Sequence, residues 1–221
     1  MNEQAWKIRR LTVMGMLTAL AFAAVFISSF FPSMVLFLKY DPKDVLLTIG
    51  AFLFGPVAGA TMVVVVALLE MVTISTTGII GFVMNVLSSC LFVCTASLFY
   101  HRNKTLPNAL LGLVCGALLM TGGMLLWNYL ITPLYMENTT REQVAGMLVP
   151  VFLPFNLFKC GLNATLTILL YKGVSTSLRA ARLLPPAESA TPVKKHLPVI
   201  GLALAVLTAL ILALLAWKGI I

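Results

Sequence analysis

The sequence predicts an all-α integral membrane protein. Of its 221 residues, 60% are hydrophobic and only 10% are charged, and the mean hydropathy is +1.02. Soluble domains average about 25% charged residues, so a soluble enzyme is excluded, as are collagen-like, disordered and disulfide-scaffold classes. Several apolar runs exceed the roughly 18 residues that a membrane-spanning helix requires. Their lengths and continuous apolar character predict helices rather than the alternating strands of a barrel.

The first apolar stretch, residues 11–38, carries no charge and follows a basic segment that contains Lys7, Arg9 and Arg10. Such a start, with the small residues Ala21 and Ala23 around Phe22, is typical of a cleaved signal peptide. The apolar sequence continues well past that point. We therefore expect a first helix that is retained.

Gly55 and Pro56 interrupt the next apolar stretch, residues 45–74. Proline lacks a backbone donor and glycine permits a reversal, so we expect a short helix, a turn and a second helix from about Val57. The basic residues favour these two crossings, because ten then lie on the cytoplasmic side with the N-terminus and four outside, against at best nine and five for one long crossing. The ten are Lys7, Arg9, Arg10, Arg102, Lys104, Lys172, Arg179, Arg182, Lys194 and Lys195.

Further helices are expected at about 80–100, 109–131 and 149–171, separated by a basic loop at 101–104 and a polar loop at 137–143. A proline-rich, charged linker then precedes a seventh apolar run that ends near Trp217. We expect a six-helix membrane domain at 1–178, a cytoplasmic linker at 179–196 and an additional transmembrane helix at 197–217. No internal repeat is apparent, which disfavours an inverted-repeat transporter.

Polar residues inside the apolar runs are candidates for function, because ionisable groups in lipid are costly without a partner or a cavity. Lys159 and Asn156 are three residues apart and share one face of the sixth helix. A site that uses both is about as probable as a lysine that snorkels to the outer surface beside an asparagine that bonds a neighbouring helix. Asn128, in an aromatic segment at the outer end of the fifth helix, lies at a similar expected depth; for the aromatics themselves an interfacial belt is the better interpretation.

Other polar groups fall on the same outer side. Asp44 is expected to cap the short second helix, a role favoured over ligand contact. Glu70 is expected near the outer surface, in solvent, and residues 75–85 add hydroxyls and glycines. The polar candidates therefore gather at one end of the bundle.

Gly15, Ala19 and Ala23 recur every four residues along the first helix. Small residues at this spacing let another helix approach closely. The strip could serve internal packing or a partner surface, and the spacing does not decide between them.

Chemistry-bearing motifs are absent from the sequence. The four cysteines lie within apolar runs, none as CxxC, and the two histidines are far apart, so no metal site is expected. The sequence has no phosphate-binding GxxxxGK[ST] loop and no hydrolase motif, and no acidic pair lies within a span. Neither an enzyme nor a source of energy is indicated, and the basic residues at helix ends point to anionic lipid rather than to nucleic acid.

Four segments, taken together in this order, resemble the riboflavin-specific S components of energy-coupling factor (ECF) transporters. They are 39–45 (KYDPKDV), 54–59 (FGPVAG), 128–135 (NYLITPLY) and 154–159 (PFNLFK). The resemblance covers about residues 8–175. The seventh apolar run lies outside the six-helix pattern, so its role stays open.

The resemblance implies a membrane subunit that captures riboflavin outside the cell. It would deliver the vitamin by associating with a transmembrane coupling subunit and two ATPases. Family ligand contacts carry over onto Asn128, Asn156 and Lys159, and less directly onto Leu38 and Tyr40. The docking strip carries over onto Ala19 and Ala23, which Gly15 extends. Riboflavin is then the transported ligand and not a cofactor; another vitamin or precursor is the nearest alternative, and a membrane scaffold or an intramembrane enzyme is the alternative from another class.

Overall fold

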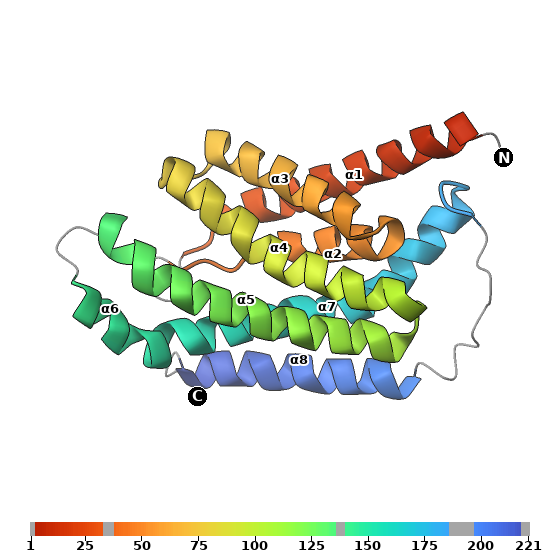
Figure 1. Ribbon diagram of the computed structural model, residues 1–221. Coiled ribbons are helices and arrows are strands. Elements are labelled where there is room, and N and C mark those ends of the chain that lie inside the picture. The colour runs from red at the N-terminus through yellow and green to blue at the C-terminus, as the bar shows by residue number, and fades with distance from the viewer. Residues whose placement is uncertain (1–2, 33–37, 136–139, 186–196, 218–221) are drawn as a thin grey trace.

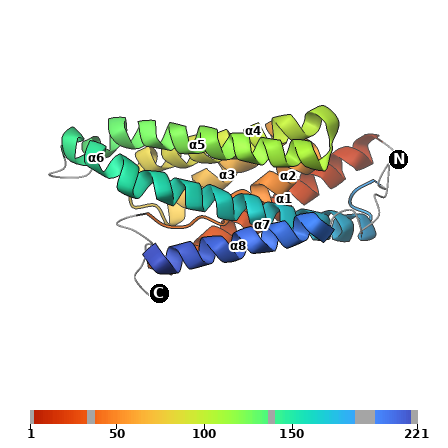
Figure 2. The same ribbon diagram turned by 90° about the horizontal axis from the view of Figure 1, so that it is seen from below.

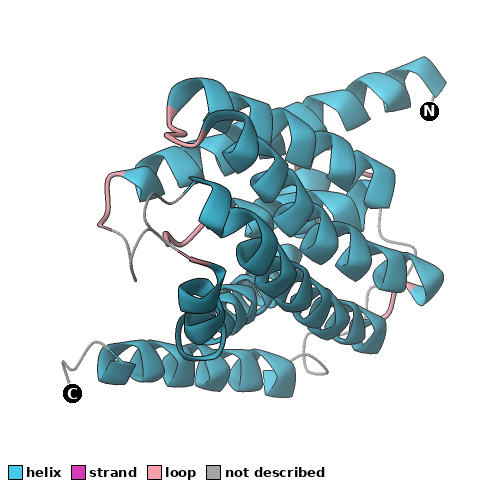
Figure 3. Cartoon of the chain, turned by 60° about the vertical axis from the view of Figure 1, so that its left-hand side comes forward, coloured by secondary structure: helices cyan, strands magenta, loops and turns pink. Residues whose placement is uncertain are grey.

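The computed structural model describes residues 3–32, 38–135, 140–185 and 197–217, and its regular structure is helical (Figures 1 and 3). Five helical segments are long and apolar enough to cross a membrane: Glu3–Ser29, Pro56–Thr73, Gly78–Asn103, Leu106–Leu134 and Arg141–Ala180. The helices in order are α1 (Glu3–Ser29), α2 (Lys43–Phe54), α3 (Pro56–Thr73), α4 (Gly78–Asn103), α5 (Leu106–Tyr135), α6 (Arg141–Met147), the π-helical turn η1 (Leu148–Phe152), α7 (Leu153–Ala180) and α8 (Leu197–Trp217). The predicted all-α class is confirmed.

The break at Gly55 and Pro56 is confirmed, because α2 ends and α3 begins there, with Gly55 at φ 101°. The helix expected in the apolar stretch 11–38 is α1, which ends at Ser29. One expectation is wrong, because the polar loop at 137–143 contains the start of α6. Thr140 and Gln143 form a capping box at that start, in which their side chains accept hydrogen bonds from backbone donors that the helix itself leaves unpaired.

The short helix α2 lies at the centre of the bundle, where it contacts α1, α3, α4 and α7 (Figure 1). It has 12 residues, about 18 Å at 1.5 Å per residue, and cannot cross a hydrocarbon layer of about 30 Å by itself. Nine of its residues are buried, including Lys43 and Asp44 at its start. The two charges at the start of this helix are therefore carried into the bundle.

The helices α4 and α5 pack against each other at glycines. A Cβ atom added at Gly112 would lie 2.6 Å from the backbone oxygen of Ala96, and one added at Gly116 would lie 2.8 Å from that of Phe92. Glycines four residues apart allow two backbones to come this close. The core beside this contact is formed by Val13, Leu17, Leu47, Phe52, Met62, Val66, Phe92, Val93, Leu113 and Met120.

The basic ends of the helices gather at one end of the bundle (Figure 1). There the Arg9 guanidinium donates to the backbone oxygen of Arg182 (2.8 Å), and Arg10 donates to that of Phe54 (3.3 Å). These oxygens lie at the C-terminal ends of α7 and α2, where a cation is favourable. The expected linker at 179–196 falls largely on residues 186–196, and Lys194 and Lys195 with it, outside the described part of the chain.

The last helix, α8, runs along α7 at the edge of the bundle in both side views (Figures 1 and 2). A Cβ atom added at Gly161 of α7 would lie 3.3 Å from the side chain of Leu210 of α8. Leu202, at 64% exposed, faces away from the bundle. A close contact thus joins α8 to α7, while α1 lies on another side of the bundle.

Candidate functional site

The segment before α2 is held against α7 by three polar contacts. Nζ of Lys159 donates to Oδ2 of Asp41 over 2.9 Å, and the Tyr40 hydroxyl donates to Oδ1 of Asn163 over 2.7 Å. The Asn163 amide also donates to the backbone oxygen of Asp41 (3.3 Å). Lys159 and Asn163 are one helical turn apart, so they meet neighbouring residues of the segment from one face of α7.

A second ion pair lies beside the first and joins α2 to α3. Nζ of Lys43 lies 2.7 and 2.8 Å from the two carboxylate oxygens of Glu70, and the two side chains are 2% and 5% exposed. Asn85 of α4 donates to Glu70 over 2.7 Å. Nζ of Lys43 is also 3.6 Å from Oδ2 of Asp41, so Asp41 lies between two ammonium groups. The expectation that Glu70 is solvated is wrong, because α2 begins inside the bundle and brings Lys43 to it.

Asp44 does not cap α2. The helix begins without a side-chain cap, and the Asp44 carboxylate accepts instead from the hydroxyl of Ser89 on α4 over 2.6 Å. Its other oxygen lies 3.5 Å from the Asn163 amide. The capping expectation is therefore wrong, since the carboxylate points across the bundle at α4 and α7. We call Asp41, Lys43, Asp44, Glu70 and Lys159 the buried charge network.

The network sets the protonation of the loop residues. Burial by itself would raise the pKa of the Asp41 carboxyl, but the ammonium groups of Lys159 and Lys43 outweigh it and lower the pKa to about 2. Burial, with the negative charge of Asp44, raises the pKa of the Tyr40 hydroxyl. At neutral pH the segment therefore carries a carboxylate acceptor and a phenol donor, as its two side-chain contacts to α7 require.

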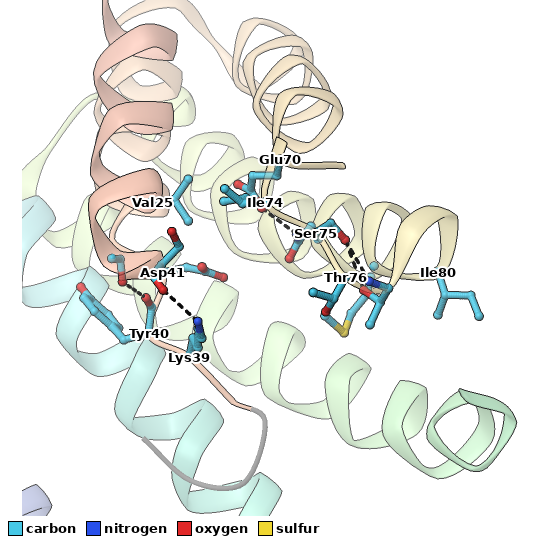
Figure 4. A pocket seen from close by; sticks show the side chains of 15 residues that line it. Val25, Lys39, Tyr40, Asp41, Glu70, Ile74, Ser75, Thr76 and Ile80 are labelled. Atoms are coloured by element: carbon cyan, nitrogen blue, oxygen red, sulfur yellow. Dashed lines mark hydrogen bonds between the residues drawn. The ribbon is translucent and has the colours of Figure 1, made fainter. Parts of the chain in front are cut away.

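A cavity of about 260 Å³ opens beside the network, between α1, the segment before α2, and the facing ends of α3 and α4 (Figure 4). Tyr40 and Asp41 reach it from the loop, and Glu70 reaches it from α3. The rest of the lining mixes hydroxyls with apolar side chains: Ser28, Ser29, Ser75, Thr76, Thr77, Val25, Ile74, Ile80 and Met84, with Lys39, Gly81 and Asn85. The polar end foreseen from the sequence is thus a real feature of the described residues.

The residues expected to bind a ligand lie in two places. Tyr40 lines the cavity, and Lys159 forms an ion pair with Asp41, which also lines it. Leu38 is half-buried in the same loop. Asn128 and Asn156 are buried, at 2% and 3% exposed, and do not line it. The structure therefore connects Tyr40 with Lys159 and places the two asparagines apart from the cavity.

The two asparagines differ in which of their side-chain groups are already hydrogen-bonded. The Asn128 amide donates to the backbone oxygen of Met124 (2.7 Å), and its oxygen accepts from Thr132 (3.0 Å). The Asn156 amide donates to the backbone oxygen of Phe152 (2.7 Å), but no described residue donates to its side-chain oxygen. Asn156 therefore keeps a free acceptor inside the bundle. Lys159 does not snorkel, because its ammonium is buried and paired.

Trp127, which the sequence placed in an interfacial belt, is partly buried. Its ring packs against the hydrophobic core, and its buried Nε1 has no hydrogen-bond partner among the described residues. A buried donor without a partner costs about 1–3 kcal/mol. Tyr129, at 39% exposed, faces outward as a belt residue does.

The strip on α1 faces out of the bundle. Gly15, Ala19 and Ala23 are all exposed, and a Cβ atom at Gly15 would meet nothing within 4 Å. The opposite face of α1 supplies the packing residues Val13, Leu17, Ala21 and Val25, each at most 4% exposed. Internal packing is therefore excluded as the reason for the strip, which leaves it open to a partner or to lipid.

Comparison with known proteins identifies the family of this chain. The family described as "ECF transporter, substrate-specific component" matches residues 9–171, about three quarters of the chain. The chain belongs to this family. It is therefore the membrane-embedded substrate-specific subunit, or S component, of an ECF-type transporter and not an enzyme, and its apolar helices make it a multi-pass membrane protein.

Individual relatives agree with the family. The chain is 30% identical over 176 residues to the riboflavin transporter RibU of Staphylococcus aureus (strain TCH60), which covers 77% of this chain and 93% of the relative. It is 27% identical over 161 residues to the riboflavin transporter FmnP of Bacillus subtilis (strain 168), covering 69% and 85%. A solved structure of the S component of a bacterial ECF transporter superposes with a TM-score of 0.64 at 30% identity, covering 78% of this chain and 99% of that one. The family match ends at residue 171, before α8 begins at Leu197.

Sequence reasoning missed Asn163 and Ser89 as members of the polar site. Asn163 had a signal, because it lies four residues after Lys159 and so shares its helix face. Ser89 had none, since a single serine on α4 could equally have faced lipid or a neighbouring helix.

Proposed function

We propose that this S component captures riboflavin at the end of the bundle that holds the buried charge network. Riboflavin is what its relatives are named for, and the isoalloxazine needs apolar walls with a few placed donors and acceptors. The free acceptor of Asn156 and the ammonium of Lys159 on one stretch of α7 support this, and they are the observation that carries the proposal.

The ligand is proposed to lie between α5, α7 and the segment before α2, with Asn128, Asn156, Lys159, Leu38 and Tyr40 as contacts. Of these five residues only Tyr40 lines the open cavity of about 260 Å³, which is slightly smaller than the range of about 300–1,000 Å³ typical of small-molecule pockets. Binding at Lys159 would require the ammonium to share its contact with Asp41 or to exchange it. Asn128 would have to use the second hydrogen of its amide, since its other groups are bonded within α5.

Delivery is proposed to occur through an ECF module of one transmembrane coupling subunit and two ATPases, reached by the exposed strip on α1. The chain has no nucleotide-binding loop of its own, so hydrolysis has to come from partners. The basic end of the bundle, with the N-terminus, is proposed to face the bacterial cytoplasm and its anionic lipid.

The test is a titration of the full chain in detergent. Ligand-free protein should quench riboflavin fluorescence saturably at one ligand per chain without ATP, and protein purified from rich medium should be yellow if flavin is carried along. A folded sample without saturable quenching removes the riboflavin assignment. A panel of other vitamins, tested by thermal shift of the same sample, then identifies a different ligand, because any ligand that binds the folded form raises its melting temperature.

A further inference from the structure

The segment Leu38–Pro42 is tied to two different helices. On one side, the Ser28 hydroxyl of α1 donates to the backbone oxygen of Tyr40 (2.6 Å), and Lys39 donates to that of Ser29 (2.9 Å). On the other side, Lys159 and Asn163 of α7 hold Asp41 and Tyr40. The segment therefore bridges α1 and α7 across the polar end of the bundle.

Asn163 has a distinctive place in this bridge. It is 1% exposed, its oxygen accepts from the Tyr40 hydroxyl, and its amide donates to the backbone oxygen of Asp41 and approaches Asp44. Its side chain thus uses both its acceptor and its donor on the segment and on the start of α2. The Tyr40 hydroxyl in turn donates its one proton to Asn163.

We propose that Asn163 is a positioning residue for ligand capture: it fixes Tyr40 and the segment Leu38–Pro42 against α7, so that a bound ligand is retained. Tyr40 then contributes its ring to the ligand and its hydroxyl to Asn163. The proposal rests on the proposed riboflavin site for its ligand but not for its geometry. The consequence is that loss of the Tyr40–Asn163 contact accelerates ligand release more than it slows ligand entry.

Two variants break the contact from opposite sides. Asn163→Leu is close in size and removes both polar groups, whereas Tyr40→Phe removes one oxygen and is the milder change if Asn163→Leu folds poorly. The matched control is Thr165→Val on α7, because the Thr165 hydroxyl donates only to the backbone oxygen of Gly161 within its own helix (2.8 Å). Each protein is the full chain in detergent.

Two measurements distinguish how firmly Asn163 holds the segment Leu38–Pro42 from how firmly the protein holds its ligand. In ligand-free protein, trypsin should cleave after the exposed Lys39 faster in both variants than in wild type and Thr165→Val, giving a fragment that begins at Tyr40. In stopped-flow fluorescence, riboflavin should dissociate about 5- to 10-fold faster from both variants, the size expected for one neutral hydrogen bond, with association changed less than 2-fold. The double variant should match Asn163→Leu alone, because Tyr40→Phe removes only a bond that Asn163→Leu already breaks.

Unchanged cleavage at Lys39, or unchanged riboflavin dissociation in a protein that binds it, overturns the proposal. A weaker affinity in Tyr40→Phe with a normal Asn163→Leu also overturns it, because the hydroxyl would then serve the ligand. If wild type binds no riboflavin, the function fails and the cleavage measurement still decides whether Asn163 holds the segment.

Discussion

Replacing Lys159 by Met tests the ion pair that joins α7 to the loop. Methionine keeps much of the side-chain length and removes the charge. Lys159 is 6% exposed, and its Nζ lies 2.9 Å from the Asp41 carboxylate. The substitution leaves Asp41 with Lys43 at 3.6 Å as its remaining cation.

The magnitude follows from these distances. At an effective dielectric constant of about 20, charges 2.9 Å apart attract by about 6 kcal/mol and charges 3.6 Å apart by about 5 kcal/mol, before the cost of desolvation is subtracted. Removing one partner of a buried pair costs about 3–5 kcal/mol in general. Because Asp41 keeps Lys43 and its side chain is 18% exposed, we expect about 2–3 kcal/mol for Lys159→Met.

Asp41→Asn breaks the same pair from the other side and should cost more. It leaves the Lys159 ammonium buried without its partner, so we expect the full 3–5 kcal/mol or so. The double variant Asp41→Asn/Lys159→Met removes the stranded charge and should be more stable than Asp41→Asn alone, by about 1–3 kcal/mol. Thermal melting of ligand-free protein in detergent measures all three.

Riboflavin affinity is measured separately by calorimetry on the same proteins. If Lys159 also donates to the ligand, Lys159→Met should weaken binding by about 5- to 150-fold, and by more than Asp41→Asn does, since the latter keeps the ammonium. Equal losses in the two variants would limit Lys159 to holding the loop. A double variant no more stable than Asp41→Asn would refute the reasoning from stranded charge.

Three further predictions follow from the packing and the charges. Ala19→Trp should abolish riboflavin uptake in cells while riboflavin binding by the purified chain persists, because the bulky ring blocks the approach of another helix to the exposed strip. The control is Leu202→Trp at an exposed position of α8, and normal uptake by Ala19→Trp would show that the strip is not the docking surface. Gly116→Ala should lower the stability by about 1–3 kcal/mol, since its Cβ would lie 2.8 Å from the Phe92 oxygen, whereas Gly122→Ala, with nothing within 4 Å, should be neutral or stabilising in the same melts; equal effects would contradict the close α4–α5 contact. Asp41 has a pKa of about 2 in the folded protein, below its unfolded value of about 3.9, so its stabilisation is present above pH 4 and is lost as the pH falls toward 2. The melting temperature should therefore fall by less between pH 4 and pH 2 in Asp41→Asn than in wild type. Equal falls in the two proteins would contradict the lowered pKa of Asp41.

The sequence by itself determined the membrane class, the helix break at Gly55 and Pro56, and the gathering of polar residues at one end. Each depends on a local property: the length of an apolar run, a residue without a backbone donor, or the side of the membrane reached after a given number of crossings. Lys159 and Tyr40 could be selected in the same way, since one is a charge in an apolar run and the other belongs to a recognisable segment.

Only the tertiary structure decided what those polar residues contact. Tyr40 and Asn163 are 123 positions apart, and Lys159 and Asp41 are 118 apart, so no periodicity along the chain relates them. Asp44 was expected to cap a helix and Glu70 to meet solvent because such local roles are the usual ones for an acidic residue. Both are buried because α2 is too short to cross the bilayer and begins inside the bundle, where its first charges find partners on α3, α4 and α7.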